Sequence, residues 1–268
     1  MMFLKNARQL SNVISKNRLD GKVAIVTAST DGIGFAIAKR LAQEGAKVVI
    51  SSRKQQNVDK ALAKLASEGL DNSVVGTVCH VLKAEDRKRL FEEAAKIGGL
   101  DILISNAAAN PSVGGVLECD EGAWDKIFDT NVKAAYLLAK EALPLLRKRD
   151  SGRIIFISSI TGYVPHQLLG AYSVSKTALL GLTKAASLDL ASENITVNCI
   201  APGIIETKFS EMITQEGPAT DQLLSQIPMN RFGKPNDVTG VAAFLSSEDS
   251  QYITGETIVV SGGMSSRL

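Results

Sequence analysis

Residues Lys22 to Gly34 read K-V-A-I-V-T-A-S-T-D-G-I-G, and this stretch decides the fold. Its first part is a run of small and β-branched residues, which is typical of a strand buried on both faces. Residues 32–44 follow, with Ile37 and Leu41 on one helical face. Glycines in a strand-to-helix turn let the backbone approach a phosphate, and the helix N-terminus favours negative charge. We therefore predict a phosphate-binding loop made by Ala28, Ser29, Thr30, Asp31, Gly32, Ile33 and Gly34.

The alternation of strand-like and helical patterns continues to the end of the chain. The predicted strands are 22–28, 47–52, 74–81, 100–105, 153–159, 195–201 and 256–260, and the predicted helices are 32–44, 55–68, 85–97, 121–147, 171–191 and 236–246. Such alternation predicts an α/β fold: a single Rossmann-type, doubly wound parallel sheet of seven strands with helices on both faces. We expect Pro144 to disturb the last turn of its helix. Residues 206–229 show no clear periodicity, and a stretch that long is a candidate lid.

Composition indicates one catalytic domain, which we place at residues 20–263. The chain has 268 residues, of which 45% are hydrophobic and 22% charged, and its net charge is +2. That charge does not indicate nucleic-acid binding, and no apolar run approaches the roughly 20 residues of a membrane span. Cys79, Cys119 and Cys199 are far apart, so we expect reduced thiols and neither a disulfide framework nor a metal site.

Both ends of the chain carry possible targeting signals. Residues 1–19 contain four basic side chains and no acid, which fits either a transit peptide or a basic N-terminal arm. The tail, residues 264–268, ends in Ser266-Arg267-Leu268, which is close to the S-K-L signal of peroxisomal import. We expect a peroxisomal protein that binds the import receptor, with the mitochondrion or the cytoplasm as alternatives.

The end of the second strand indicates which cofactor the loop would hold. Proteins that bind NAD place an acid there for the ribose 2′-hydroxyl. This chain has Ser52, Arg53 and Lys54 instead. An arginine can bind a 2′-phosphate through charge-assisted hydrogen bonds, which favours NADP(H). The alternative is that Arg53 and Lys54 form only a solvated loop.

One pair of side chains has the spacing of an acid/base site. Tyr172 and Lys176 are four residues apart on a predicted helix, so they share one face. An ammonium near a phenol favours the phenolate, so we expect Lys176 to lower the pKa of Tyr172. Such a tyrosine can donate a proton to a carbonyl oxygen or take one from an alcohol. Ser159, at the end of the fifth strand, could hydrogen-bond the same oxygen; Ser158 is its competitor, because neighbouring strand residues face opposite sides.

Together these segments resemble the short-chain dehydrogenase/reductase family over roughly residues 20–263. The resemblance rests on the glycine loop, Ser105-Asn106-Ala107-Ala108, the Y-x-x-x-K at 172–176 and Pro202-Gly203. It implies hydride transfer between NADP(H) and a carbonyl/alcohol pair, with Asn131, Ser159, Tyr172 and Lys176 as catalytic residues. Ser159 and Tyr172 would contact the substrate. The further cofactor contacts that it implies are Val81, Asn106, Ala107, Tyr172, Lys176, Pro202, Gly203, Ile205 and Thr207.

Three departures from the family pattern lie at the cofactor end. Ala28 replaces the first loop glycine, so this turn must tolerate a Cβ. Ser105-Asn106-Ala107-Ala108 replaces the usual N-N-A-G, and His80 replaces the usual acid near the adenine. The stretches S-T-D-G-I-G, V-C-H-V and S-R-L resemble a carbonyl-reductase branch of the family. That resemblance implies a homotetramer that reduces ketones and α-dicarbonyls with NADPH, with retinal as a further candidate.

Two other functions stay open from the sequence. A non-catalytic NADP(H)-binding sensor or interaction protein would use the same loop but has no need of the tyrosine. A sugar epimerase or dehydratase uses the same Tyr/Lys pair, but those relatives usually carry a larger C-terminal domain than the residues after Pro202 provide.

Overall fold

The computed structural model of the chain describes residues 17–214 and 218–266. Seven parallel strands form one sheet in the order β3-β2-β1-β4-β5-β6-β7, which confirms the predicted fold. The strand bounds are β1 Val23–Val26, β2 Lys47–Ser52, β3 Val74–Val78, β4 Ile102–Ser105, β5 Gly152–Ile157, β6 Ile195–Pro202 and β7 Thr257–Val260.

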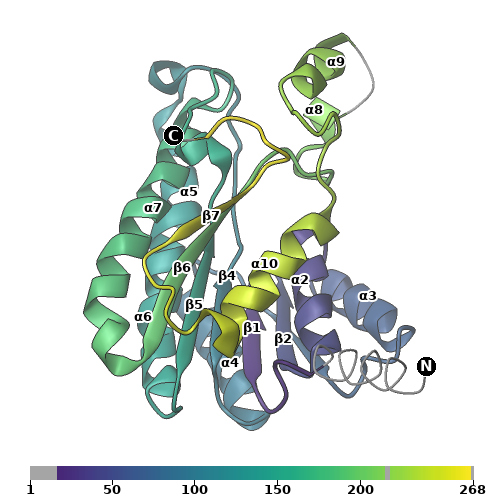
Figure 1. Cartoon of the computed structure of the whole chain (residues 1–268), viewed down its shortest axis with the longest axis vertical. Helices are drawn as coiled ribbons and strands as arrows, with labels where there is room; N and C mark the ends of the chain where they lie inside the picture. The colour runs from purple at the N-terminus through teal and green to yellow at the C-terminus, as the bar shows by residue number, and fades with distance from the viewer. Residues whose placement is uncertain (1–16, 215–217, 267–268) are drawn as a thin grey trace, which may run out of the picture.

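Helices cover both faces of the sheet (Figure 1). Helices α2 (Gly32–Gln43), α3 (Gln55–Ala66) and α10 (Pro235–Ser246) pack on one face, and α4 (Ala84–Lys96), α6 (Ala134–Leu146) and α7 (Gly170–Leu190) on the other. Strand β1, in the interior of the sheet, alternates between the two cores: Ala24 and Val26 belong to the first, and Val23 and Ile25 to the second. This alternation is the pleat of a strand buried on both faces.

The predicted helix over 121–147 is wrong in one respect. The structure divides it into α5 (Glu121–Phe128), a π-helical turn at Asp129–Lys133, and α6, and the helix continues through Pro144 to Leu146. The α-helix is therefore interrupted at the turn that contains Asn131, whose side chain forms hydrogen bonds with Ala109 and Ser175. Wide π-turns are frequent at functional sites.

The stretch 206–229 holds two short helices, α8 (Glu211–Thr214) and α9 (Pro218–Ser225). Figure 1 shows both beyond the carboxyl edge of the sheet, above α10. The targeting prediction for residues 1–19 lies mostly outside the described residues, as do Arg267 and Leu268 of the tail. Leu19, placed in the N-terminal arm from the sequence, is fully buried in the core and belongs to the fold.

The cysteines are unpaired, as predicted. Cys79 and Cys199 are buried and Cys119 is half-buried. Burial raises the pKa of the Cys79 thiol to about 12 and that of Cys199 to about 11, which keeps both protonated. Within residues 17–214 and 218–266, no helix has the length and apolarity needed to cross a bilayer.

Candidate active site

The predicted site residues lie at the carboxyl edge of the sheet. The strand order reverses between β1 and β4, so the loops after these strands diverge, and parallel sheets bind ligands in the crevice formed there. The phosphate loop follows β1, and Asn106 and Ala107 follow β4. Arg53, Val81, Ser159 and Gly203 come after the other strands of the same edge.

Hydrogen bonds join the loops after β1 and β4. The buried Thr27 hydroxyl oxygen accepts from the backbone N–H groups of Asn106 at 3.0 Å and Ala107 at 3.2 Å. The Asn106 amide donates in return to the carbonyls of Thr27 at 3.0 Å and Ala28 at 3.1 Å. Ala28 has a φ of +50°, so the turn holds a Cβ in the left-handed region where glycine is usual. Asn106 thereby fixes the backbone conformation at the start of the loop that is predicted to bind the phosphates.

Two observations show that this crevice fits a nucleotide cofactor. A Cβ at Gly34 would lie 2.5 Å from the Asn106 Nδ2 and 2.6 Å from the Ala28 carbonyl oxygen, so only glycine leaves the backbone open there. Ser51, near the end of β2, has a buried hydroxyl without a hydrogen-bond partner. This hydroxyl lies one residue before Ser52, near the predicted ribose position, and keeps a hydrogen-bonding capacity that no protein group uses.

Replacing Gly34 by alanine is expected to weaken NADPH binding about tenfold and to lower the free energy of unfolding by about 1–3 kcal/mol, because the neighbour at 2.6 Å is backbone. Fluorescence titration with NADPH and thermal unfolding measure the two effects. Gly181→Ala is the matched control: a Cβ added to this helical glycine would meet nothing within 4 Å, so the change should leave binding unaltered and increase stability. Equal affinities for all three proteins would show that the loop does not bind the cofactor.

The adenosine end is more open. Arg53 and Lys54 are exposed between β2 and α3, and Ser52 is half-buried. The Val81 side chain is buried, and its carbonyl accepts from Arg87 at 2.8 Å, so that carbonyl already has a protein partner. The His80 backbone N–H donates to Asp86 at 2.8 Å. The sequence analysis missed Asp86, whose carboxylate lies beside His80, the residue that replaces the usual acid.

An ion pair that the sequence did not reveal joins the phosphate loop to the segment after β6. The Lys208 ammonium lies 2.7 Å from the Asp31 carboxylate, which also accepts from the Gly32 N–H. The hydrogen bond from Lys208 and then that from Gly32 hold the pKa of Asp31 below its usual value. Thr207 also faces the loop, because a Cβ at Gly32 would lie 3.2 Å from its methyl group. The candidate lid is thus in contact with the phosphate loop.

The structure brings Tyr172 and Lys176 together, as predicted. The Lys176 Nζ lies 5.4 Å from the centre of the Tyr172 ring and donates to the Ile157 carbonyl at 2.8 Å. Both side chains are buried. The expected lowering of the tyrosine pKa is wrong for the protein alone: burial raises the pKa of Tyr172 above its usual value, because a buried phenolate loses its hydration. Burial also lowers the pKa of Lys176 to about 8.

The hydroxyls of Ser158 and Ser159, which follow β5, have different surroundings. The Ser158 hydroxyl is buried and donates to the Lys176 carbonyl at 2.8 Å. The Ser159 hydroxyl is half-buried and accepts from the Thr161 N–H at 3.1 Å, which leaves its own proton available. This favours Ser159 as the substrate-binding serine.

Asn131 makes three side-chain hydrogen bonds and is almost fully buried. Its Oδ1 accepts from the Ala109 N–H at 2.7 Å, and its Nδ2 donates to the Ala109 carbonyl at 3.1 Å and to the Ser175 hydroxyl at 2.9 Å. None of these bonds reaches Lys176. Ser175 is a residue that the sequence analysis missed, although its place three residues after Tyr172 is the spacing for a serine bonded to its own helix.

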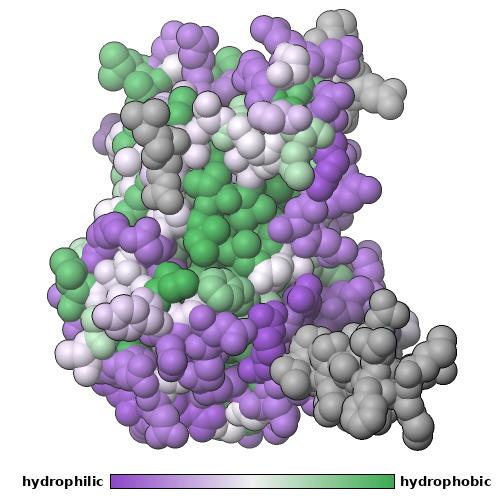
Figure 2. Space-filling model, viewed as in Figure 1, coloured by the Kyte–Doolittle hydropathy of each residue, from purple (hydrophilic) through white to green (hydrophobic). Residues whose placement is uncertain are grey.

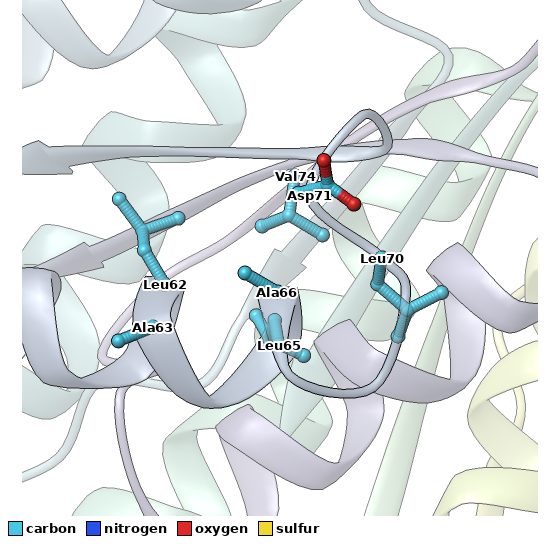
Figure 3. A pocket seen from close by; sticks show the side chains of 7 residues that line it. All are labelled: Leu62, Ala63, Leu65, Ala66, Leu70, Asp71 and Val74. Carbon is cyan, nitrogen blue, oxygen red and sulfur yellow. The ribbon is translucent and has the colours of Figure 1, made fainter.

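Hollows on the described surface include one away from the predicted site and one beside it. One, of about 310 Å³, lies between α3 and the start of β3, at the opposite edge of the sheet from the phosphate loop, and leucine side chains surround it with Asp71 in the adjoining loop (Figure 3). The other, of about 210 Å³, adjoins the ends of β6 and β7 and includes Gly203 and Ile205. Gly203 is required where it lies, because a Cβ would be 2.9 Å from the Ser261 Cα. Among the described residues, no group of three or more His, Cys, Asp or Glu side chains could hold a metal.

A glycine loop and a Tyr–Lys pair at the carboxyl edge of a parallel sheet are typical of NAD(P)-dependent oxidoreductases. The chain belongs to the short-chain dehydrogenase/reductase family: the family model described as enoyl-(acyl carrier protein) reductase matches residues 27–265. Dehydrogenase/reductase SDR family member 4 from Bos taurus is 55% identical over 266 residues, which are 98% of this chain and 95% of that protein. Tropinone reductase-like 3 from Erythroxylum coca is 51% identical, covering 94% of this chain and 96% of that one.

Solved structures of the family superpose closely. A short-chain type dehydrogenase/reductase from Mycobacterium marinum has a TM-score of 0.85 at 30% identity, over 93% of this chain and 97% of that one. The RhlG/NADP active-site complex of Pseudomonas aeruginosa has a TM-score of 0.84 at 30% identity, over 92% of this chain and 97% of that one.

Proposed function

We propose that this protein is an NADPH-dependent reductase of ketones and α-dicarbonyls, with retinal as a further candidate substrate, and that Tyr172 is its general acid. The observation that carries the proposal is the buried Tyr172–Lys176 pair in the first turns of α7. A protein that only binds the cofactor would have no use for a desolvated phenol beside an ammonium. The names of the relatives, which include a reductase, and the NADP bound by RhlG support the proposal.

Tyr172, Ser159 and Lys176 have distinct tasks in this reaction. NADPH, when bound, supplies the hydride that reduces the carbonyl carbon. Tyr172 donates its phenolic proton to the carbonyl oxygen, and the Ser159 hydroxyl hydrogen-bonds the same oxygen. Lys176 offsets the phenolate charge that remains and holds the ribose hydroxyls. The raised pKa of Tyr172 keeps the phenol protonated, which is the form that reduction requires.

Apolar side chains next to Tyr172 favour apolar carbonyl compounds. The Phe209 ring lies 5.8 Å from the Tyr172 ring and is 57% exposed, and Val164 and Leu168, just before α7, are also exposed. Exposed apolar side chains beside a reactive group indicate an apolar ligand.

An NADPH-consumption screen over α-dicarbonyls, aryl ketones, retinal and steroids tests the proposed function. We expect turnover with apolar ketones or α-dicarbonyls, and faster turnover with NADPH than with NADH. Binding of NADPH without consumption by any of these compounds would favour the sensor instead.

The proposal includes a peroxisomal homotetramer. Strand β7 forms one edge of the sheet, and Ile258, Val259 and Val260 are only half-buried there. Figure 2 shows an apolar hollow on this face, where β7 and α10 lie in Figure 1. An uncovered apolar edge strand is suited to pairing with another chain. Import by the receptor through Ser266-Arg267-Leu268 would place the assembly in the peroxisome, and sedimentation with localisation of the tagged protein measures both points.

The alkaline limit of activity is expected to come from Lys176. Its pKa is lowered to about 8 by burial, so the ammonium is present below that pH and is lost above it. Because the charge stabilises the phenolate formed in reduction, kcat/KM should be level below pH 8 and fall as the pH rises through about 8. Lys176→Arg keeps its charge throughout this range, so its profile should stay level. If kcat/KM falls above pH 8 equally in the unaltered protein and in Lys176→Arg, the loss of activity comes from another titrating group.

A further inference from the structure

We infer that Ser175 is a positioning residue that joins the acid/base helix to the cofactor side of the crevice through Asn131. Ser175 lies in α7 between Tyr172 and Lys176 and is fully buried. Its hydroxyl donates to the Tyr172 carbonyl at 2.6 Å and accepts from the Asn131 Nδ2 at 2.9 Å. One hydroxyl therefore links the helix of the proposed acid to the π-turn.

The directions of these hydrogen bonds are determined by their partners. A carbonyl only accepts, so the Ser175 proton must point to Tyr172, which leaves a lone pair for Asn131. A backbone N–H only donates, so the Asn131 Oδ1 must face the Ala109 N–H, and the Nδ2 must face Ser175. Donors and acceptors in this series of hydrogen bonds can therefore be assigned in only one way, and Ser175 forms the end that contacts Tyr172.

The other end of the chain of bonds reaches the cofactor side. Asn131 holds both backbone groups of Ala109, at 2.7 and 3.1 Å. Ala109 continues the segment after β4 that begins with Asn106, whose side-chain amide donates to the Ala28 carbonyl of the phosphate loop at 3.1 Å. In an α-helix the carbonyl of residue i accepts a hydrogen bond from the N–H of residue i+4, so the Tyr172 carbonyl is also the acceptor for the Lys176 N–H. Ser175 is thus placed to fix the position of Tyr172 and Lys176 relative to the segment after β4 that contains Ala109.

A serine bonded to its own helix is common and usually has no functional meaning. Ser187 on α7 provides the matched case: it is buried, and its hydroxyl donates to the Lys184 carbonyl at 2.8 Å, again three residues back. The contact with Asn131 is what separates Ser175 from Ser187. Ser187→Ala loses only the hydrogen bond to its own helix, whereas Ser175→Ala also loses the contact with Asn131. Comparing the two variants therefore isolates the effect of that contact.

Amide hydrogen exchange at Ala109 tests the inference without any substrate. In Ser175→Ala the Asn131 amide loses one of its anchors, so the Ala109 N–H should exchange about tenfold faster. Ser187→Ala and the unaltered protein should exchange alike at Ala109. Unchanged exchange in Ser175→Ala, or an equal rise in Ser187→Ala, overturns the inference.

The kinetic arm rests on the proposed function. We expect Ser175→Ala to lower kcat for carbonyl reduction about tenfold with an unchanged Kd for NADPH, and Ser187→Ala to keep full kcat. Because Ser175 acts through Asn131, adding Ser175→Ala to Asn131→Ala should cost nothing further. Additive losses contradict the inference. Absence of turnover in the unaltered protein would remove the proposed function, while the exchange experiment would still decide the role of Ser175.

Discussion

Tyr172→Phe is expected to lower kcat for carbonyl reduction by about 10³-fold and to raise the Kd for NADPH by less than about fivefold, the effect of one lost hydrogen bond. The substitution removes only the phenolic hydroxyl, so the buried ring keeps its place beside Phe209. The reduced carbonyl oxygen then has no acid from which to take its proton. Steady-state kinetics with the best carbonyl compound and fluorescence titration with NADPH measure the two constants.

Tyr252→Phe is the matched control, because this tyrosine is fully exposed beyond α10. The control should retain full kcat. Full activity in Tyr172→Phe would contradict the assignment of Tyr172 as the acid. An equal loss in Tyr252→Phe would show that the effect does not come from the site.

Arg53→Asp is expected to lower kcat/KM with NADPH by about 100-fold and to change kcat/KM with NADH less than about threefold. Arg53 is exposed directly after β2, where the 2′-phosphate of NADP would lie, and α3 begins two residues later. The variant replaces an attraction for the phosphate by a repulsion. It also introduces an acid of the kind with which NAD-binding proteins hold the ribose 2′-hydroxyl.

Lys148→Asp controls for the change of net charge. Lys148 is exposed just after α6, at the amino edge of the sheet. A loss with NADPH in Arg53→Asp that Lys148→Asp does not share identifies a local phosphate contact. Equal efficiencies with NADPH and NADH in the unaltered protein would contradict the NADP assignment.

The sheet could be predicted because each strand carries its own signal. Strand β1 is a continuous apolar run, β5 is apolar from Ile154 to Ile157, and the helices between strands bear one apolar face, so order and type follow from local patterns. The pairing of Thr27 with Asn106 follows from strand order, since each residue directly follows one of two adjacent strands. The Tyr172–Lys176 pair follows from helical spacing alone.

Features that depend on tertiary contacts were beyond the sequence. The π-turn at Asp129–Lys133 is held by the bonds of Asn131 to Ala109 and Ser175, and no local pattern distinguishes it from the α-helix on either side. The pKa of Tyr172 was predicted with the wrong sign because spacing showed the nearby ammonium but not the burial of the phenol. The Asp31–Lys208 pair joins segments far apart in the chain.

The most direct test of the central claim is isotope transfer from NADPH. The protein would be incubated with NADPH carrying deuterium on the transferring face of C4 and with the best carbonyl compound of the screen, and the alcohol analysed by mass spectrometry. We expect each alcohol molecule to carry one deuterium on the carbinol carbon, and Tyr172→Phe to form almost none. Alcohol without the label, or no alcohol at all with bound NADPH, would contradict the claim that this protein reduces carbonyl compounds by hydride transfer.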